Sequence, residues 1–186
     1  NVSSPSNLAT TSTPSSLLFS DGFESGNLAQ WTSVTGLTVQ QLQVYAGAYA
    51  ARETSTGLAT YAYKQLSATQ GELFYRVRFK IVSQGSNLAY LLKFRTASGS
   101  SILGAYVSST GKLAYRNDAG QQTVVSALPV SRGVWHMLQI RIQINGGAGQ
   151  TETWLDGVRV DALSKAEALG TAPVGRIQLG DNSTGT

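Results

Sequence analysis

The sequence contains no cysteine and only one histidine, His136. Without cysteine, the chain cannot form disulfide bonds, thiolate nucleophiles or zinc sites built on Cys. With one histidine and no Gly-x-Ser-x-Gly motif, it also lacks the sequence signature of a serine-hydrolase triad. In the alternating pattern, His136 falls on the same side of the predicted strand as Leu138 and Ile140. We therefore expect His136 to have a structural role.

Long apolar runs and clusters of charge are also missing. No run approaches the roughly 18 residues that a membrane-spanning helix needs, so we expect no membrane span. The net charge is +4, and the 14 basic residues are scattered along the chain. A nucleic-acid partner is therefore not expected, and acidic partners are only weakly favoured.

Glycine, serine and threonine are abundant, with 20 glycines and a hydrophobic share of 41%. This composition is typical of many short strands joined by turns. Residues 1–16 are rich in Ser, Thr and Pro and predict a tail or linker. Residues 17–186 predict one domain, whose only segment of helix-forming composition is 162–169. Alternating apolar and polar residues predict strands at 37–44, 48–52, 58–66, 72–82, 88–96, 102–107, 112–116, 123–127, within 133–160, and at 175–179.

The clearest pattern is the stretch from Gly133 to Asp161. It reads as a strand, a glycine-rich loop at 145–149, a returning strand and a tight Asp156-Gly157 turn. We expect Trp135, Trp154 and the isoleucines of this stretch to build the core. The stretch resembles laminin-G-like, concanavalin A-like jelly-roll modules in two motifs, Gly133-Val-Trp135-His136-Met-Leu138 and Trp154-Leu155-Asp156-Gly157-Val158-Arg159-Val160.

The resemblance implies an all-β, antiparallel β-sandwich of the jelly-roll type, found in a secreted bacterial protein. Its members usually carry one more strand after a segment like 176–185, so the domain is expected to lack a final strand. The Asp-Gly-Phe-Glu-Ser-Gly entry at 21–26 resembles the opening of such modules, which often hold a structural calcium there. The predicted ligands are Asp21, Glu24 and Asp181; the alternative is that Asp21 and Glu24 cap a turn.

Basic and amide side chains alternate with apolar ones in three predicted strands. If these strands are neighbours, their polar faces form a positive stripe that suits carboxylate or sulfate groups, with tyrosines available to stack on sugar rings. The alternative is an ordinary solvent-exposed sheet face. The predicted ligand-binding residues are Arg76, Arg78, Lys80, Lys93, Arg95, Gln139, Arg141 and Gln143, and the stacking candidates are Tyr61, Tyr63, Tyr90, Tyr106 and Tyr115.

Catalytic signatures of the fold are not found. The pair Glu152 and Asp156 has the wrong spacing for the Glu-x-Asp-x-x-Glu motif of laminarinase-type hydrolases. The Gln-Ile-His signature of alginate lyases is also absent, although lyases of this fold use Tyr, His, Arg and Gln. We therefore expect no enzyme, with a polysaccharide lyase as the remaining catalytic alternative.

Two non-catalytic hypotheses stay open. The first is an extracellular or cell-surface module that recognises carbohydrate, including acidic glycans, for binding or adhesion. The second is a structural subunit of a filament or surface layer, in which residues 1–16 add a strand to a neighbouring copy.

Overall fold

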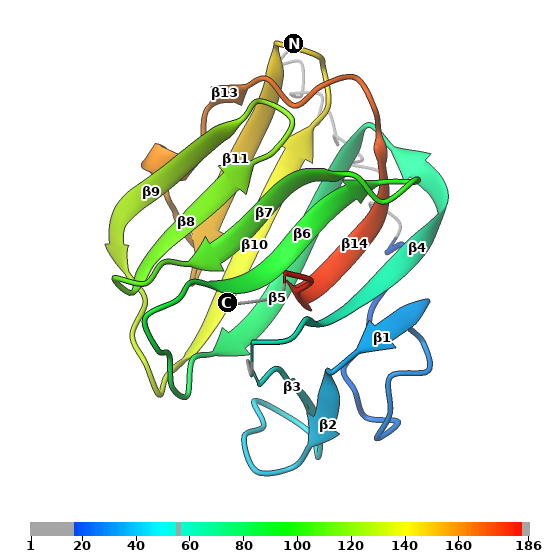
Figure 1. Ribbon diagram of the computed structural model, residues 1–186, viewed down its shortest axis with the longest axis vertical. Helices are drawn as coiled ribbons and strands as arrows, with labels where there is room; N and C mark the ends of the chain where they lie inside the picture. The colour runs from blue at the N-terminus through cyan, green and yellow to red at the C-terminus, as the bar shows by residue number, and fades with distance from the viewer. Residues whose placement is uncertain (1–16, 55–56, 184–186) are drawn as a thin grey trace, which may run out of the picture.

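The structure is a computed structural model that describes residues 17–54 and 57–183 (Figure 1). Nearly every element in these ranges is a strand, as the alternating pattern predicts. The strands are β1 (Ser33–Thr35), β2 (Thr38–Gln40), β3 (Ala50–Arg52), β4 (Thr60–Gln70), β5 (Glu72–Lys80), β6 (Ala89–Thr96), β7 (Ser101–Val107), β8 (Lys112–Asn117), β9 (Gln122–Pro129), β10 (Trp135–Gln143), β11 (Gly149–Leu155), β12 (Val158–Arg159), β13 (Ala166–Glu167) and β14 (Val174–Asp181).

Two antiparallel sheets pack face to face. The front sheet, nearest the viewer in Figure 1, has the order β1-β4-β14-β6-β7-β8-β9. The back sheet has the order β12-β11-β10-β5, with β13 beside β11, and β2 and β3 form a separate hairpin. The predicted all-β jelly-roll sandwich is therefore confirmed.

The core lies between the sheets because each strand turns alternate side chains inward. Leu138, Ile140 and Ile142 of β10 are buried against residues of the front sheet such as Leu92 and Phe94. Each such side chain stabilises the fold by about 2 kcal/mol through its buried area. The isoleucines at 140 and 142 thus occupy the core, as the sequence predicts.

The Asp156-Gly157 turn is confirmed in detail. Both residues have positive φ, 54° and 83°, which two-residue hairpins of this type require. The carboxylate of Asp156 accepts a hydrogen bond from the amide of Met137 at 2.7 Å and lies 2.7 Å from Nδ1 of His136. Nε2 of His136 faces the carbonyl of Ser131 at 3.1 Å, so the buried histidine has a structural role.

Residues 162–169, the one segment of helix-forming composition, do not form an α-helix. Only a single 3-10 turn, Asp161–Leu163, forms there, followed by β13. Residues of β13 pair with Gln150 and Gly149 of β11. The buried carboxylate of Glu167 is held by Tyr115 and Asn117 of β8, and these tertiary contacts override the local helix propensity.

Trp135 and Trp154 were expected in the core, and this prediction is wrong. Both lie on the outer face of the back sheet and are half-buried. On β11 the inward-facing side chains are those of Thr151, Thr153 and Leu155. The two threonine hydroxyls donate to the carbonyl of Leu163 at 3.3 and 3.0 Å, which offsets the cost of burying them.

Two further predictions concern the chain ends and membranes. Residues 1–16, to which we assigned a tail and a strand-donating role, lie outside the described residues, so both assignments stay predictions.

In the described part of the chain, no helix has the length and apolarity to cross a membrane.

Candidate functional site

The predicted positive stripe is divided between opposite faces of the sandwich. Strands β5 and β10 are neighbours in the back sheet, so Arg76, Arg78 and Lys80 do lie beside Gln139, Met137 and Trp135. Strand β6, which carries Lys93 and Arg95, belongs to the front sheet. The condition for one continuous stripe, that all three strands are neighbours, is therefore not met. Which strands become neighbours in a jelly roll is set by long-range pairing.

Arg141 on the back sheet is already neutralised. Its Nε lies 2.6 Å from Glu72 and its Nη1 lies 2.9 Å from Glu152. Both carboxylates hold the pKa of Arg141 above its ordinary value, and the hydrogen bond that Arg141 donates to Glu72 is the largest cause. Gln143 sits at the same end of the face, opposite Glu72. This end of the back sheet is thus poorly suited to an anionic ligand.

The front sheet gathers a larger polar set. Across its outer face, the pairing register aligns Tyr63 of β4, Gln178 of β14, Lys93 of β6, Gly104 of β7 and Arg116 of β8 in one row. A second row aligns Gln65, Arg176 and Arg95 beside the first. We call the residues Tyr61, Tyr63, Tyr90, Lys93, Arg95, Tyr106, Arg176, Gln178 and Asn182 the front cluster.

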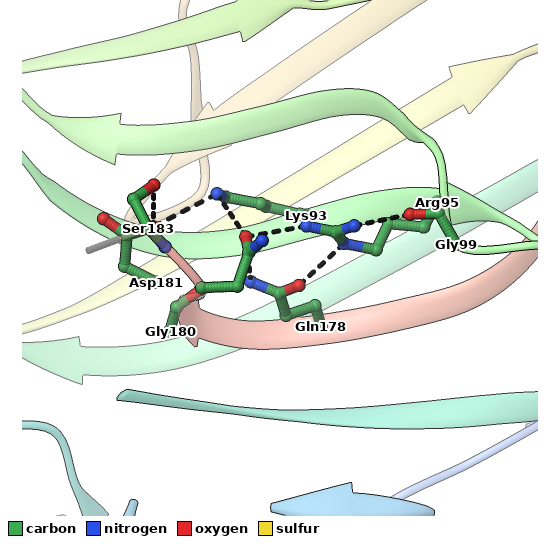
Figure 2. A network of polar contacts seen from close by, with 8 residues as sticks. Lys93, Arg95, Gly99, Gln178, Gly180, Asp181 and Ser183 are labelled. Carbon is green, nitrogen blue, oxygen red and sulfur yellow. Dashed lines mark hydrogen bonds and ion pairs between the residues drawn. The ribbon is translucent and has the colours of Figure 1, made fainter. Parts of the chain in front are cut away.

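A hydrogen-bond network holds the centre of the front cluster (Figure 2). Nζ of Lys93 lies 3.2 Å from Asp181 and 2.8 Å from Oδ1 of Asn182. Arg95 donates to Gln178 at 2.7 Å, to the carbonyl of Gly99 at 2.5 Å and to Asn182 at 2.7 Å. These bonds fix both cations, so little side-chain entropy is lost when an anion binds them.

The electrostatics of Lys93 and Asp181 follow from their burial. Loss of hydration lowers the pKa of Lys93, and the neighbouring Asp181 carboxylate opposes that shift. Burial alone would raise the pKa of Asp181, but hydrogen bonds from Ser183 and the charge of Lys93 hold it below its ordinary value. The two groups therefore form a buried ion pair whose charges cancel.

Arg95 and Arg176 differ from Lys93 because all their hydrogen-bond partners are neutral. Nε of Arg176 donates to the side chain of Gln65 at 2.6 Å, and its guanidinium lies 4.9 Å from the ring centroid of Tyr63. Among the described residues, neither arginine forms an ion pair. Loss of hydration lowers the pKa of Arg95, and the charge of Arg176 adds to this effect, whereas Tyr61 and the carboxylates of Asp118 and Asp181 oppose it.

The two arginines border a small hollow of about 90 Å³ on the outer face. Amide groups and tyrosine rings supply the rest of its lining. The hollow is lined by Tyr61, Tyr63, Arg95, Arg176, Gln178 and Asn182. It thus presents guanidinium groups to bind a carboxylate, and aromatic rings that can contact a sugar.

A tyrosine pair extends the cluster along β6 and β7. The ring centroids of Tyr90 and Tyr106 lie 5.2 Å apart, and Nζ of Lys93 lies 3.7 Å from the Tyr90 ring centroid. Burial raises the pKa of Tyr90 to about 12 and also raises that of Tyr106. Both phenols therefore stay protonated at neutral pH. Tyr115, another predicted stacking residue, is instead fully buried in the core.

The predicted calcium ligands occupy separate environments. Asp21 accepts hydrogen bonds from the amide of Phe23 and from Nε1 of Trp31, and Glu24 accepts from the amides of Ala48 and Tyr49. Asp181 pairs with Lys93. Nowhere in residues 17–54 and 57–183 do three or more His, Cys, Asp or Glu side chains gather around a possible metal position. These contacts favour the turn-capping alternative for Asp21 and Glu24, and calcium binding stays a prediction.

Arg176, Gln178 and Asn182 were missed as site residues. The signal was present, because Arg-Ile-Gln-Leu at 176–179 alternates in the same way as the strands that were singled out. The position of β14 between β4 and β6 could not be read from that alternation.

The sequence matches no protein-family model and no curated protein. Its fold is similar to several solved structures. An endo-β-1,4-glucuronan lyase from the fungus Trichoderma reesei is 16% identical, with 83% of this chain and 80% of that chain covered and a TM-score of 0.58. The cellulose-induced protein Cip1 is 14% identical, with 87% and 88% covered and a TM-score of 0.59.

A third similar structure is a sialidase, with 10% identity and a TM-score of 0.61. The match covers 88% of this chain but only 15% of the sialidase chain, so it concerns one part of a larger protein. At these identities the likeness shows the fold alone. It agrees with the concanavalin A-like sandwich that the hairpin motifs predict.

These structures correct the prediction that the chain is not an enzyme. That prediction relied on missing hydrolase and alginate-lyase motifs, yet the fold is shared with a glucuronan lyase over most of the chain. The absence of those motifs is therefore no ground for excluding catalysis.

Proposed function

We propose that the front cluster binds an acidic polysaccharide, with a uronate carboxylate seated against Arg95 and Arg176. The observation that supports this most directly is the placement of two guanidinium groups, without ion-pair partners among the described residues, at one hollow. A carboxylate there gains charge-assisted hydrogen bonds and relieves the repulsion between the two cations.

The tyrosine rings near the hollow favour a sugar as the ligand over an isolated anion. Tyr61 and Tyr63 line the hollow, and Tyr90 and Tyr106 lie along the same face. Aromatic faces pack against the apolar C–H faces of sugar rings. The glucuronan lyase that shares this fold acts on a uronate polymer, as its name states, and an extracellular location suits such a ligand. Extracellular location and cell adhesion stay predictions.

The test is calorimetric titration with polyglucuronate and with its carboxyl-reduced, neutral form. We expect the wild-type chain to bind only the acidic polymer. Replacing Arg95 and Arg176 by Gln should weaken binding at least about tenfold, because each charge-assisted bond contributes about 1.5–3 kcal/mol. The matched control is Arg52→Gln with Lys112→Gln, which removes two exposed charges outside the cluster. Equal affinity and equal stoichiometry of the two double variants would refute the proposal.

A second candidate function is β-elimination on the bound uronate, favoured by the position of Tyr61 in the same hollow as Arg95. Arg95 would neutralise the carboxylate, and the phenolate of Tyr61 would take the proton from C5 to become the neutral phenol. The C–H electrons then form the C4=C5 double bond, the C4–O bond breaks, and the leaving oxygen takes a proton from a second tyrosine such as Tyr63.

This chemistry is checked by the ultraviolet absorbance of the unsaturated product. Tyr61→Phe should abolish product formation and leave the affinity for polyglucuronate within about twofold, because the ring is retained. Tyr49→Phe, at a tyrosine that lies against Gly26 and outside the hollow, is the matched control. A wild-type chain that binds the polymer and forms no product would rule out elimination and leave the binding function intact.

A further inference from the structure

The outer face of the back sheet carries a line of cations along β5. Arg76, Arg78 and Lys80 alternate with the inward-facing Tyr75, Val77 and Phe79. Their side chains form no hydrogen bond or ion pair with any described residue, in contrast to Arg141 on the neighbouring strand. Three adjacent positive charges of this kind repel one another, and a bound polyanion would relieve that repulsion.

Aromatic rings flank these cations. Tyr45, from the loop between β2 and β3, places its ring 4.1 Å from the guanidinium carbon of Arg78 and 5.8 Å from the ring of Trp135. Tyr45 remains 51% exposed, and Phe74 at the other end of the line is 52% exposed. The loop therefore brings a ring from outside the back sheet onto its outer face, beside the cations. We call Phe74, Arg76, Arg78, Lys80, Tyr45 and Trp135 the back cluster.

The back cluster is long and open. From Phe74 to Lys80 it follows six residues of extended strand, roughly 20 Å at about 3.3 Å per residue. Strand β5 is the edge strand of the back sheet, so no further strand of the described structure borders it on that side. The charged groups of a linear ligand can lie along the cations of this edge, from Arg76 to Lys80.

We propose that the back cluster is a second binding surface for a linear anionic polysaccharide. Regularly placed cations suit the repeated charges of such a polymer, and the exposed rings suit its sugar faces. The two clusters lie on opposite outer faces of the sandwich, since the inner faces of both sheets form the core. A single molecule would then hold two polymer chains and cross-link them. Only this cross-linking rests on the proposed function of the front cluster; the second surface does not.

The experiment compares two double variants with the wild-type chain. The back variant carries Arg76→Gln and Arg78→Gln, and the front variant carries Arg95→Gln and Arg176→Gln. Titration with polyglucuronate should give two binding sites on the wild-type chain and one on each double variant. Light scattering of the mixture, which reports cross-linked aggregates, should fall to the baseline for both variants. The Arg52→Gln, Lys112→Gln chain is the control and should behave as wild type.

The outcomes separate the two proposals. A back variant with wild-type affinity, stoichiometry and scattering overturns the second surface, whatever the front variant does. If the front variant behaves as wild type and the back variant loses binding, the proposed function fails and the second surface stands. Equal binding of the back cluster to single-stranded DNA of matched charge would overturn its assignment to a polysaccharide.

Loss of charge on an edge strand can also promote aggregation of the protein itself. Tyr45→Ser supplies an independent test, because Tyr45 is in a loop and its replacement leaves the edge strand unchanged. We expect this variant to remain monodisperse in size-exclusion chromatography and to lose at least about fivefold in affinity at the back cluster. Unchanged affinity of Tyr45→Ser in the front-variant background, where only the back cluster binds, would count against the proposal.

Discussion

Oδ1 of Asn182 accepts a hydrogen bond from Nη2 of Arg95 at 2.7 Å, although 87 positions separate the two residues in the sequence. The same oxygen accepts from Nζ of Lys93 at 2.8 Å and from Nε2 of Gln178 at 3.2 Å. All three neighbours are donors, and two are cations. An aspartate at this position would keep each hydrogen bond and would add a negative charge at the centre of the front cluster.

We therefore expect Asn182→Asp to unfold at the same or a slightly higher temperature and to bind polyglucuronate at least about tenfold more weakly, which corresponds to about 1.4 kcal/mol. Thermal unfolding and calorimetric titration measure the two effects separately. Asn145→Asp, in the exposed loop between β10 and β11, makes the same change of charge away from the cluster and is the control. Undiminished binding by Asn182→Asp would show that the front cluster does not hold the acidic group.

Gly104 leaves room for the ring of Tyr90. A Cβ atom at position 104 would lie 2.7 Å from Cε1 of Tyr90 and 3.0 Å from Cγ of Lys93. Gly104→Ala should displace the Tyr90 ring, lower the free energy of unfolding by about 1–3 kcal/mol and weaken polysaccharide binding. Urea unfolding and titration with polyglucuronate provide the measurement.

The control for this glycine is Gly71, between β4 and β5. An added Cβ there meets no atom within 4 Å, and the residue does not have positive φ. Gly71→Ala should therefore be neutral or stabilise the fold by up to about 1 kcal/mol. Similar unfolding curves for the two alanine variants would mean that Tyr90 is not held against Gly104.

The strands could be predicted from the sequence because their two signals are local. The alternation of apolar and polar residues identifies the inward face of β10. Residues that favour positive φ, such as Gly157, identify where the chain turns. The tight turn and the role of His136 followed from the same short stretch. The sandwich class followed because about a dozen short strands without intervening helices have few other ways to bury one face each.

The candidate site could not be predicted in the same way, because it depends on which strands become neighbours. Both outer faces of a sandwich show the same alternation, so Arg78 and Lys93 look alike in the sequence and lie on opposite faces in the fold. The tryptophans were misplaced for a related reason. Hydrophobicity favoured Trp154 for the core, whereas the actual inward residue Thr153 satisfies its hydroxyl with a carbonyl that only the folded chain supplies.

Glu167 is a buried carboxylate that joins β13 to the front sheet. It accepts hydrogen bonds from Tyr115 and Asn117, and Lys165 lies 3.2 Å away. Burial alone would raise its pKa, but these partners hold the pKa of Glu167 below its ordinary value. Glu167→Gln should lower the free energy of unfolding at neutral pH by about 2–3 kcal/mol, because buried donors lose their charged acceptor.

The effect of this substitution should depend on pH. A carboxylate with a depressed folded-state pKa stabilises the fold fully above its unfolded pKa of about 4.3 and loses that contribution as the pH falls through the folded value. The difference between wild type and Glu167→Gln should thus be constant above about pH 5 and shrink below about pH 4. Glu152→Gln removes a partly exposed partner of Arg141 and is the control, with an expected cost under about 1 kcal/mol. A pH-independent difference for Glu167→Gln would contradict the assigned role of the charge.

Asp156 combines two roles that different substitutions can separate. Its backbone has φ of 54°, and its carboxylate contacts His136 and the amide of Met137. Burial alone would raise the pKa of Asp156, but the contacts with His136 and Met137 hold it below its ordinary value. Asparagine tolerates positive φ nearly as well as aspartate, whereas alanine does not. Asp156→Asn therefore removes the charge and replaces one acceptor oxygen by an amide donor, whereas Asp156→Ala removes the charge, both hydrogen bonds and the backbone preference.

We expect Asp156→Asn to cost about 1 kcal/mol of stability at neutral pH and Asp156→Ala to cost at least about 1 kcal/mol more, measured by urea unfolding. The asparagine variant should also lose the acid dependence that the depressed pKa of Asp156 contributes below about pH 4. Binding of polyglucuronate at the front cluster should be unchanged in both variants, because the turn belongs to the back sheet. Equal costs for the two variants would show that the positive φ of Asp156 carries no strain, and that the stability of this turn comes from its hydrogen bonds alone.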